Sequence, residues 1–202
     1  MIGIIDYGMG NIHSVQKALE NLGGKTFVTN KPQDIITCEK IVLPGVGAFS
    51  DAMQELEKSG MAAVIKQAIK EKKIFLGICL GMQLLFEASE EAGNTPGLGI
   101  LKGRVKKFVA KKGLKVPQMG WNQLKIKDEC LLLKGLSGNP YVYFCHSYYP
   151  DPADKRVIAA SCDYGNNFAA VVCKDNLYAV QFHPEKSQAV GLKILKNFVN
   201  LC

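Results

Sequence analysis

A cysteine between two glycines stands at the end of an apolar run, and its surroundings could make it a nucleophile. Residues 75–81 (FLGICLG) pass from a strand-like run into a Gly-x-Cys-x-Gly turn around Cys79, and residues 83–87 then favour a helix start. A strand, a sharp turn and a helix in this order make a nucleophile elbow. Gly77 and Gly81 suit a strained turn that leaves no room for Cβ atoms, and the helix N-terminus would favour the thiolate. The pattern alone is equally compatible with a tight turn around a buried, unreactive cysteine.

A histidine and a glutamate near the C-terminus could activate that cysteine. His183 follows the alternating run 177–182, and Pro184 favours an extended backbone at His183. We therefore expect His183 at the end of a strand, where open α/β sheets carry their active sites. Glu185 is close enough in sequence to hydrogen-bond the imidazole and to stabilise the imidazolium. Cys79, His183 and Glu185 would then serve as nucleophile, base and orienting carboxylate in an acyl transfer.

His146 is the alternative base. It also follows a strand-like run, but no acidic residue lies beside it before Asp151. The pairing of His183 with a carboxylate, in a chain that also carries a cysteine elbow, favours His183.

Two backbone segments could stabilise the negative oxygen that forms during acyl transfer, which requires N–H donors. The N–H group of Leu80 directly follows the nucleophile. The Gly-rich segment 44–47 (PGVG) ends an earlier strand-like run and could supply a second donor. Taken alone, these four residues favour a plain turn.

The elements that must position these residues alternate between strand and helix in the first half of the chain. Apolar runs predict strands over residues 2–6, 25–29, 40–43 and 73–76. Helical spacing of apolar residues predicts helices over 15–22 and 62–69. This alternation indicates an α/β fold with a mostly parallel central sheet and helices on both faces.

Short β-like runs dominate the second half. We predict strands over residues 104–109, 122–127, 141–145, 157–161, 168–173 and 177–182. They are expected to add antiparallel strands to the sheet or to form an accessory layer. Leu192, Leu195, Phe198 and Val199 form the apolar stripe of a closing helix. No repeat or linker divides the sequence, so we expect a single domain over residues 1–202.

The composition is that of a soluble globular protein, with 48% hydrophobic and 21% charged residues. The N-terminus has no basic segment before its apolar run, which argues against a signal peptide. The longest apolar stretch, residues 74–86, is shorter than the roughly 18 residues of a spanning helix. We therefore expect a cytoplasmic protein with no membrane partner.

The seven cysteines are scattered and form no CxxC pair, and the chain has only three histidines. Protein zinc sites need clusters of such residues, so we expect neither a metal nor another cofactor. An odd number of scattered cysteines in a cytoplasmic protein favours reduced thiols over a disulfide framework.

A net charge of +7 raises the question of nucleic-acid binding. The basic residues are spread along the chain with one local concentration, which contains a single aromatic residue, Phe108, and overlaps no nucleic-acid motif. We therefore expect a solvated hairpin or a docking surface there, and no nucleic-acid partner. The basic residues of this segment are Lys102, Arg104, Lys106, Lys107, Lys111, Lys112 and Lys115.

Five segments together resemble one known family. They are residues 44–47 (PGVG), 77–83 (GICLGMQ), 117–122 (PQMGWN), 146–149 (HSYY) and 181–187 (QFHPEKS). Over essentially its whole length the chain resembles the class I, triad-type glutamine amidotransferases, which implies a flavodoxin-like α/β fold. Residues 44–47 and 117–122, with the opening 6–11 (DYGMGN), make it similar to the members that serve histidine biosynthesis.

The resemblance implies a glutaminase that converts glutamine to glutamate and ammonia through a cysteine thioester. The ammonia would pass to a cyclase with a (β/α)8-barrel fold, which makes imidazole glycerol phosphate and the aminoimidazole nucleotide AICAR. By motif, Val46 would provide the second oxyanion N–H group, beside that of Leu80, after a rearrangement of its loop. Glutamine would be held by Gly47, Gln83, Ser147 and Tyr148, and the partner interface would include Asn11, Trp121, Tyr143 and Lys186.

Three other functions stay open. Paralogous subunits with the same motifs supply ammonia to barrels that amidinate nucleotide-linked sugars. A cysteine hydrolase that acts on peptides would share the triad, but its activity would not depend on glutamine. A binding module with an inactive triad is the third, and the presence of Cys79, His183 and Glu185 argues against it.

Overall fold

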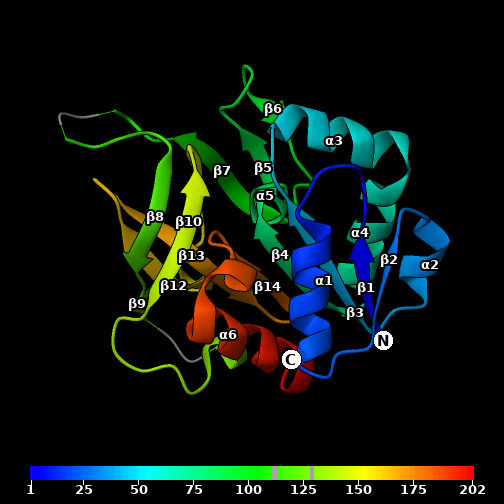
Figure 1. Cartoon of the computed structure of the whole chain (residues 1–202). Coiled ribbons are helices and arrows are strands. Elements are labelled where there is room, and N and C mark those ends of the chain that lie inside the picture. Colours follow the sequence, from blue (N-terminus) through cyan, green and yellow to red (C-terminus); the bar gives the residue numbers. More distant parts are fainter. Residues whose placement is uncertain (111–112, 128–129) are drawn as a thin grey trace.

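The structure, a computed structural model, describes residues 1–110, 113–127 and 130–202. Five parallel strands form most of the central sheet, in the pairing order β2 (Thr26–Thr29), β1 (Ile2–Ile5), β3 (Lys40–Gly45), β4 (Ile74–Cys79) and β14 (Leu177–Val180). Three antiparallel strands extend the sheet beyond β14, namely β13 (Asn167–Lys174), β12 (Ile158–Asp163) and β9 (Lys125–Ile126). Figure 1 shows this mixed sheet, and the predicted α/β fold is confirmed.

Helices cover both faces of the sheet. One face carries α1 (Ile12–Asn21) and α6 (Gln188–Asn200), and the other carries α2 (Pro32–Ile36), α3 (Phe49–Lys58) and α4 (Met61–Lys70). Successive side chains of a strand point to opposite faces, so β3 contributes Leu43 to the core under α3 and α4, and Val42 to the core under α1 and α6. Within the described residues, no helix combines the length and apolar character that a membrane span requires.

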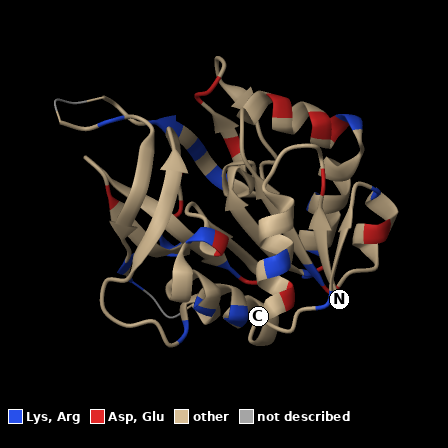
Figure 2. Ribbon diagram, in the orientation of Figure 1, with Lys and Arg blue, Asp and Glu red and all other residues tan. Residues whose placement is uncertain are grey.

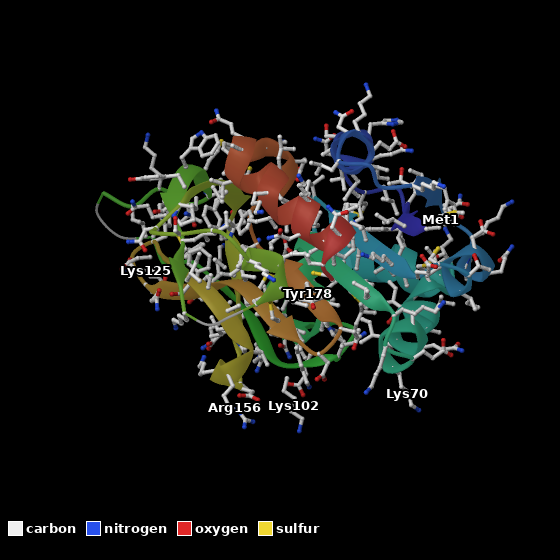
Figure 3. All side chains as sticks on the ribbon, turned by 90° about the horizontal axis from the view of Figure 1, so that it is seen from below. Met1, Lys70, Lys102, Lys125, Arg156 and Tyr178 are labelled. Carbon is white, nitrogen blue, oxygen red and sulfur yellow. A yellow bond between two sulfur atoms is a disulfide. The ribbon has the colours of Figure 1, made fainter. Side chains whose placement is uncertain are left out.

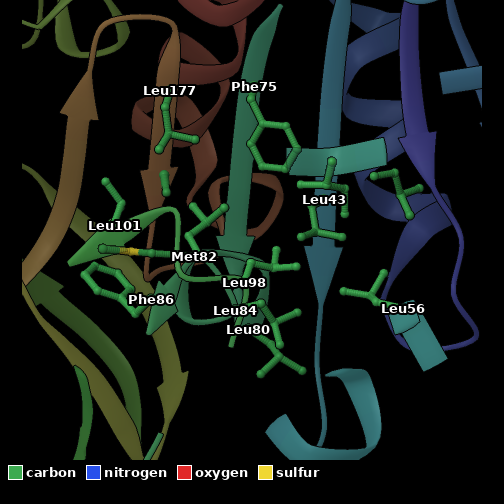
Figure 4. Close-up of a cluster of buried hydrophobic side chains, with 14 of the residues drawn as sticks. Leu43, Leu56, Phe75, Leu80, Met82, Leu84, Phe86, Leu98, Leu101 and Leu177 are labelled. Atoms are coloured by element: carbon green, nitrogen blue, oxygen red, sulfur yellow. The ribbon is translucent and has the colours of Figure 1, made fainter. Parts of the chain in front are cut away.

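Apolar packing anchors the single helical turn α5 (Leu80–Gln83), which follows β4. Leu80 and Met82 lie among Leu43, Leu84 and Phe86 in the core under α3 and α4 (Figure 4). Full burial of one such side chain contributes about 2 kcal/mol. The segment that immediately follows Cys79 is therefore firmly attached to the core.

The second half of the chain also builds two smaller sheets beside the central one. The first pairs β10 (Tyr141–His146) with β8 (Gln118–Gln123). The second has the order β11 (Tyr148–Pro152), β7 (Leu101–Lys107), β5 (Phe86–Ser89) and β6 (Thr95–Pro96). The predicted strand over residues 122–127 is wrong as a single element, because it is divided between β8 and β9 in different sheets.

The predicted helix over residues 83–87 is also wrong. The helix after Cys79 is the short α5, which ends at Gln83, and Phe86 begins strand β5. The carbonyl oxygen of Leu84 accepts from the N–H of Leu98 at 2.8 Å, and that of Phe86 accepts from Gly99 at 3.1 Å. Pairing with a later segment thus takes the carbonyl groups that a longer helix would have used.

Cys130 and Cys173 form a disulfide, which corrects the expectation that all seven cysteines are reduced. The bond joins β13 to the segment before the short helix η1 (Leu131–Leu133), and the two cysteines lie 43 positions apart in sequence. Sequence spacing did not reveal the pair because only the tertiary fold brings these segments together. The free cysteines are Cys38, Cys79, Cys145, Cys162 and Cys202.

The first part of the basic segment is strand β7, which pairs with both β11 and β5. Figure 2 shows basic residues following one another along this strand, and Lys102 extends outward at the rim of the molecule in Figure 3. Lys106 forms an ion pair with Asp151 of β11 at 2.7 Å. Lys111 and Lys112 lie outside the described residues.

Candidate active site

Cys79 occupies a strained turn at the end of β4. Its φ is 55° and its ψ is −109°, and a positive φ costs a residue with a side chain roughly 1–2 kcal/mol. The flanking glycines permit this turn. A Cβ on Gly81 would lie 1.9 Å from the carbonyl oxygen of Leu43, and one on Gly77 would lie 2.8 Å from the carbonyl oxygen of Gly81. The steric reason predicted for the Gly-x-Cys-x-Gly pattern is confirmed.

Strand β14 brings the histidine to the cysteine. β4 and β14 are parallel neighbours with Ile78 opposite Val180, so both strands end at the same edge of the sheet. Cys79 ends the first strand, and His183 lies shortly beyond the end of the second. Active sites of open α/β sheets form at this carboxyl edge.

Cys79, His183 and Glu185 lie together at this edge. The Nδ1 atom of His183 lies 2.9 Å from Oε1 of Glu185, and the His183 ring is near enough to Cys79 for the sulfur to influence its pKa. The side chains of His183 and Glu185 are only 4% and 1% exposed. Burial lowers the pKa of His183, but the hydrogen bonds and charges of Cys79 and Glu185 outweigh it and raise this pKa from 6.5 to about 10. The imidazole is therefore held protonated beside the sulfur at neutral pH.

A second group of hydrogen bonds fixes the turn that carries His183. The N–H of His183 donates to the carbonyl of Tyr143 at 2.9 Å. The hydroxyl of Ser187, which is fully buried, donates to the His183 carbonyl at 2.6 Å and accepts from the Tyr143 N–H at 2.9 Å. Strand β10 thereby holds the short helix η3 (Pro184–Lys186) in place. Sequence reasoning missed Ser187, since its partner in β10 lies 44 positions away.

A cavity of about 340 Å³ opens beside Cys79. This volume lies near the lower end of the range for ligand sites, about 300–1,000 Å³, and suits one small polar molecule. Its lining includes Cys79, His183, both predicted oxyanion residues and all four predicted substrate residues, which are Val46, Leu80, Gly47, Gln83, Ser147 and Tyr148. Lys186, His146, Cys145, Pro117 and Glu91 complete it.

Glu91 is a lining residue that sequence reasoning did not single out. Its carboxylate accepts a hydrogen bond from the N–H of Phe49 at 2.8 Å, at the first residue of α3. A carboxylate there satisfies a free N–H group and complements the helix dipole. The contact ties α3 to the rim of the cavity.

His146 also lines the cavity, but its environment differs from that of His183. Its Nδ1 atom lies 2.7 Å from the carbonyl oxygen of Tyr148, and its ring packs against Phe108, Phe144 and Phe168. Burial lowers the pKa of His146 to about 4, the hydrogen bond to Tyr148 opposes this, and the charge of His183 adds to it. Since Nδ1 faces a carbonyl, the neutral ring must donate from that atom. His146 therefore orients Tyr148, whereas the ring near Cys79 is that of His183.

The site also contains Gln181, which sequence reasoning placed in a motif but did not assign a role. Gln181 follows β14, is fully buried, and places its side-chain nitrogen 3.7 Å from the sulfur of Cys79. The one sequence feature that could have pointed to Gln181 as a site residue is its place at the end of an otherwise apolar run.

The comparison with known families rests on nearly the whole chain. The sequence model described as glutamine amidotransferase class-I matches residues 3–201. The chain belongs to this family. It is 52% identical over 203 residues to a Syntrophotalea carbinolica protein named imidazole glycerol phosphate synthase subunit HisH, covering 98% of each chain. A Methanocaldococcus jannaschii protein of the same name is 50% identical over 201 residues, and the match covers all of both chains.

Solved structures support the amidotransferase fold. A crystal structure described as glutamine amidotransferase superposes with a TM-score of 0.74 at 19% identity, covering 95% of this chain and 94% of that one. The structure of PurLQS from Thermotoga maritima gives 0.75 at 19% identity, covering 98% and 97%. At such identity these likenesses concern the fold alone.

The four residues expected at a partner interface come from three places in this amidotransferase. Asn11 precedes α1 just beyond the end of β1, and Lys186 lines the cavity. Trp121 and Tyr143 are opposite each other on β8 and β10, with ring centroids 6.1 Å apart, and Trp121 is 46% exposed. Their role in binding a partner remains a prediction.

Proposed function

We propose that this chain hydrolyses glutamine to glutamate and ammonia, as the glutaminase subunit of an imidazole glycerol phosphate synthase in histidine biosynthesis. The observation that carries the proposal is the buried group of Cys79, His183 and Glu185 beside a cavity sized for one amino acid. The full-length similarity to proteins named HisH supports the choice of pathway.

The first half-reaction forms a thioester. The Cys79 thiolate attacks the carboxamide carbon of glutamine, and the backbone N–H groups of Val46 and Leu80 stabilise the resulting oxyanion. The carbon–nitrogen bond then breaks as protonated His183 gives its proton to the leaving nitrogen, which departs as ammonia. Glu185 keeps Nδ1 protonated and the ring oriented through the 2.9 Å contact.

The second half-reaction releases glutamate. A water molecule attacks the thioester carbon while His183, now neutral, accepts its proton. The carbon–sulfur bond breaks and the sulfur leaves as the thiolate, with His183 protonated again beside it. Gly47, Gln83, Ser147 and Tyr148 hold the substrate along the cavity wall throughout.

The ammonia would pass to a cyclase subunit with a (β/α)8-barrel fold, in a cytoplasmic heterodimer. Ammonia protonates in water, so its delivery needs an interface that excludes solvent. Large apolar side chains lie exposed near the cavity and on β8, where Val46 is 41%, Trp121 46% and Met119 64% exposed. The whole chain, residues 1–202, would act as one glutaminase domain in this complex.

The test uses the chain with its cyclase partner and compares glutamine with ammonium as the nitrogen source. We expect Cys79→Ala to abolish the glutamine-dependent reaction and to leave the ammonium-dependent one intact. The matched control is Cys38→Ala, which removes a free buried thiol elsewhere and should keep both activities. Full glutamine-dependent activity in Cys79→Ala would refute the proposal.

A further inference from the structure

Gln181 is a fully buried polar side chain that contacts the sulfur of Cys79. Its backbone N–H donates to the carbonyl of Ala170 at 2.9 Å, which ties the residue to the neighbouring strand β13. Because β14 runs beside β4, this attachment places Gln181 next to the nucleophile. A buried amide is costly unless its polar atoms are paired, so its partners define its role.

The direction of the Gln181 amide follows from its neighbours. The side-chain nitrogen of Gln83 lies 2.9 Å from the carbonyl oxygen of Tyr148, which can only accept a hydrogen bond. The same nitrogen lies 3.0 Å from the side chain of Gln181, so the atom it meets there must be the Gln181 oxygen. The other end of Gln181, which faces Cys79, is therefore the NH2 group.

We propose that Gln181 is a further catalytic residue, which donates a hydrogen bond to the Cys79 thiolate and couples the nucleophile to the substrate-binding wall. The series runs from the sulfur through Gln181 and Gln83 to the carbonyl of Tyr148, which also accepts from His146 at 2.7 Å. This inference rests on the proposed glutaminase function, in which Tyr148 holds the substrate.

A purely structural role would not require this arrangement. An apolar side chain of similar size could fill the same space without any polar partner. A donor aimed at sulfur gains most when the sulfur is ionised, because hydrogen bonds to charged groups are about twice as strong as neutral ones. Gln181 therefore stabilises the thiolate more than the thiol, in addition to the charge that His183 places near the same sulfur.

The test measures the alkylation rate of Cys79 by iodoacetamide as a function of pH, resolved by peptide mass spectrometry in the full chain. Gln181→Met keeps the volume but removes the donor, and Gln181→Asn keeps an amide that is one methylene too short. For both variants we expect the acid limb of the Cys79 rate profile to move upward by about one pH unit, equal to about tenfold slower alkylation on that limb.

The control is Asn197→Leu, which removes another buried amide, one that donates to the carbonyls of Leu132 and Lys134, neither of which lines the cavity. It should lose stability without moving the profile. Profiles of Gln181→Met and Gln181→Asn that coincide with the wild type would overturn the inference. If wild-type Cys79 reacts no faster than the other free thiols, the proposed glutaminase function itself is in doubt, so the two failures are distinguishable.

Discussion

The nucleophile and the base meet at one edge of the sheet, but the chain holds them in different ways. The residues that permit the Cys79 turn, Gly77, Gly81 and those of α5, are close to it in sequence, although Gly81 and α5 also pack against Leu43 of β3. His183 is held by contacts that are distant in sequence, through Ser187 and strand β10. A strained turn can thus be specified locally, whereas the position of the base depends on how β14 and β10 are placed.

The largest effect should come from disturbing the turn that holds Cys79. In Gly81→Ala the new Cβ would meet the Leu43 carbonyl oxygen at 1.9 Å, and backbone atoms cannot move away as a flexible side chain can. We expect a loss of about 3 kcal/mol or more in the free energy of unfolding, together with loss of activity. Urea denaturation measures the first and a glutaminase assay the second.

A matched variant, Gly138→Ala, separates crowding from a general intolerance of glycine replacement. Gly138 has a φ of 68°, and a Cβ added there would have no heavy atom within 4 Å. Only the backbone cost of about 1–2 kcal/mol therefore applies. Equal destabilisation by the two variants would show that the turn around Cys79 is not crowded.

The next effect concerns the carboxylate behind the base. In Glu185→Gln the amide can still contact Nδ1 of His183, but it no longer stabilises the imidazolium, so the pKa of His183 should fall. We expect kcat for glutamine to drop about 100-fold with little change in KM. Steady-state kinetics test this, with Glu57→Gln on the exposed side of α3 as the control. An unchanged kcat in Glu185→Gln would exclude the carboxylate from catalysis.

The same contrast between local and distant contacts explains what the sequence could predict. The parallel strands, the elbow and the pairing of His183 with Glu185 each depend on patterns within a few residues. Helix α3 was also within reach, because Phe49, Ala52, Met53 and Leu56 recur at helical spacing. This spacing was visible in the sequence, but no helix was predicted from it.

The remaining features depend on segments that meet only in the folded chain. Residues 84–87 favour a helix locally, yet pairing with residues 98–101 makes a strand of Phe86. Nothing near Cys130 in sequence indicates its bond to Cys173. In the sequence Gln181 is only the end of a predicted strand, and its contact with Cys79 depends on the pairing of β14 with β4.

A smaller effect should follow from removing the contact between Ser187 and β10 that holds the turn of His183. Ser187→Ala removes the hydroxyl that joins the His183 carbonyl to the Tyr143 N–H and leaves both groups without this partner. We expect a loss of about 1–3 kcal/mol in stability and a drop of roughly tenfold in kcat, since the base becomes less well placed.

Its control is Ser59→Ala, whose hydroxyl bonds the carbonyl of Glu55 at an exposed helix end. That variant should change stability by less than about 1 kcal/mol and leave kcat unaltered. If Ser187→Ala retains full kcat, β10 does not position the base through this serine.

The smallest effect should appear in the way that His183 makes the folding stability depend on pH. The pKa of His183 is about 10 in the folded chain against 6.5 ordinarily, so the unfolded chain loses this proton first as pH rises. Its contribution to stability is complete below pH 6.5 and is lost as pH passes through about 10. We expect the stability difference between wild type and His183→Gln to fall on the order of 1 kcal/mol between pH 7 and 10, because part of the raised pKa depends on the charge of Cys79. A flat difference for His183→Gln would mean that the imidazolium is not stabilised in the folded site.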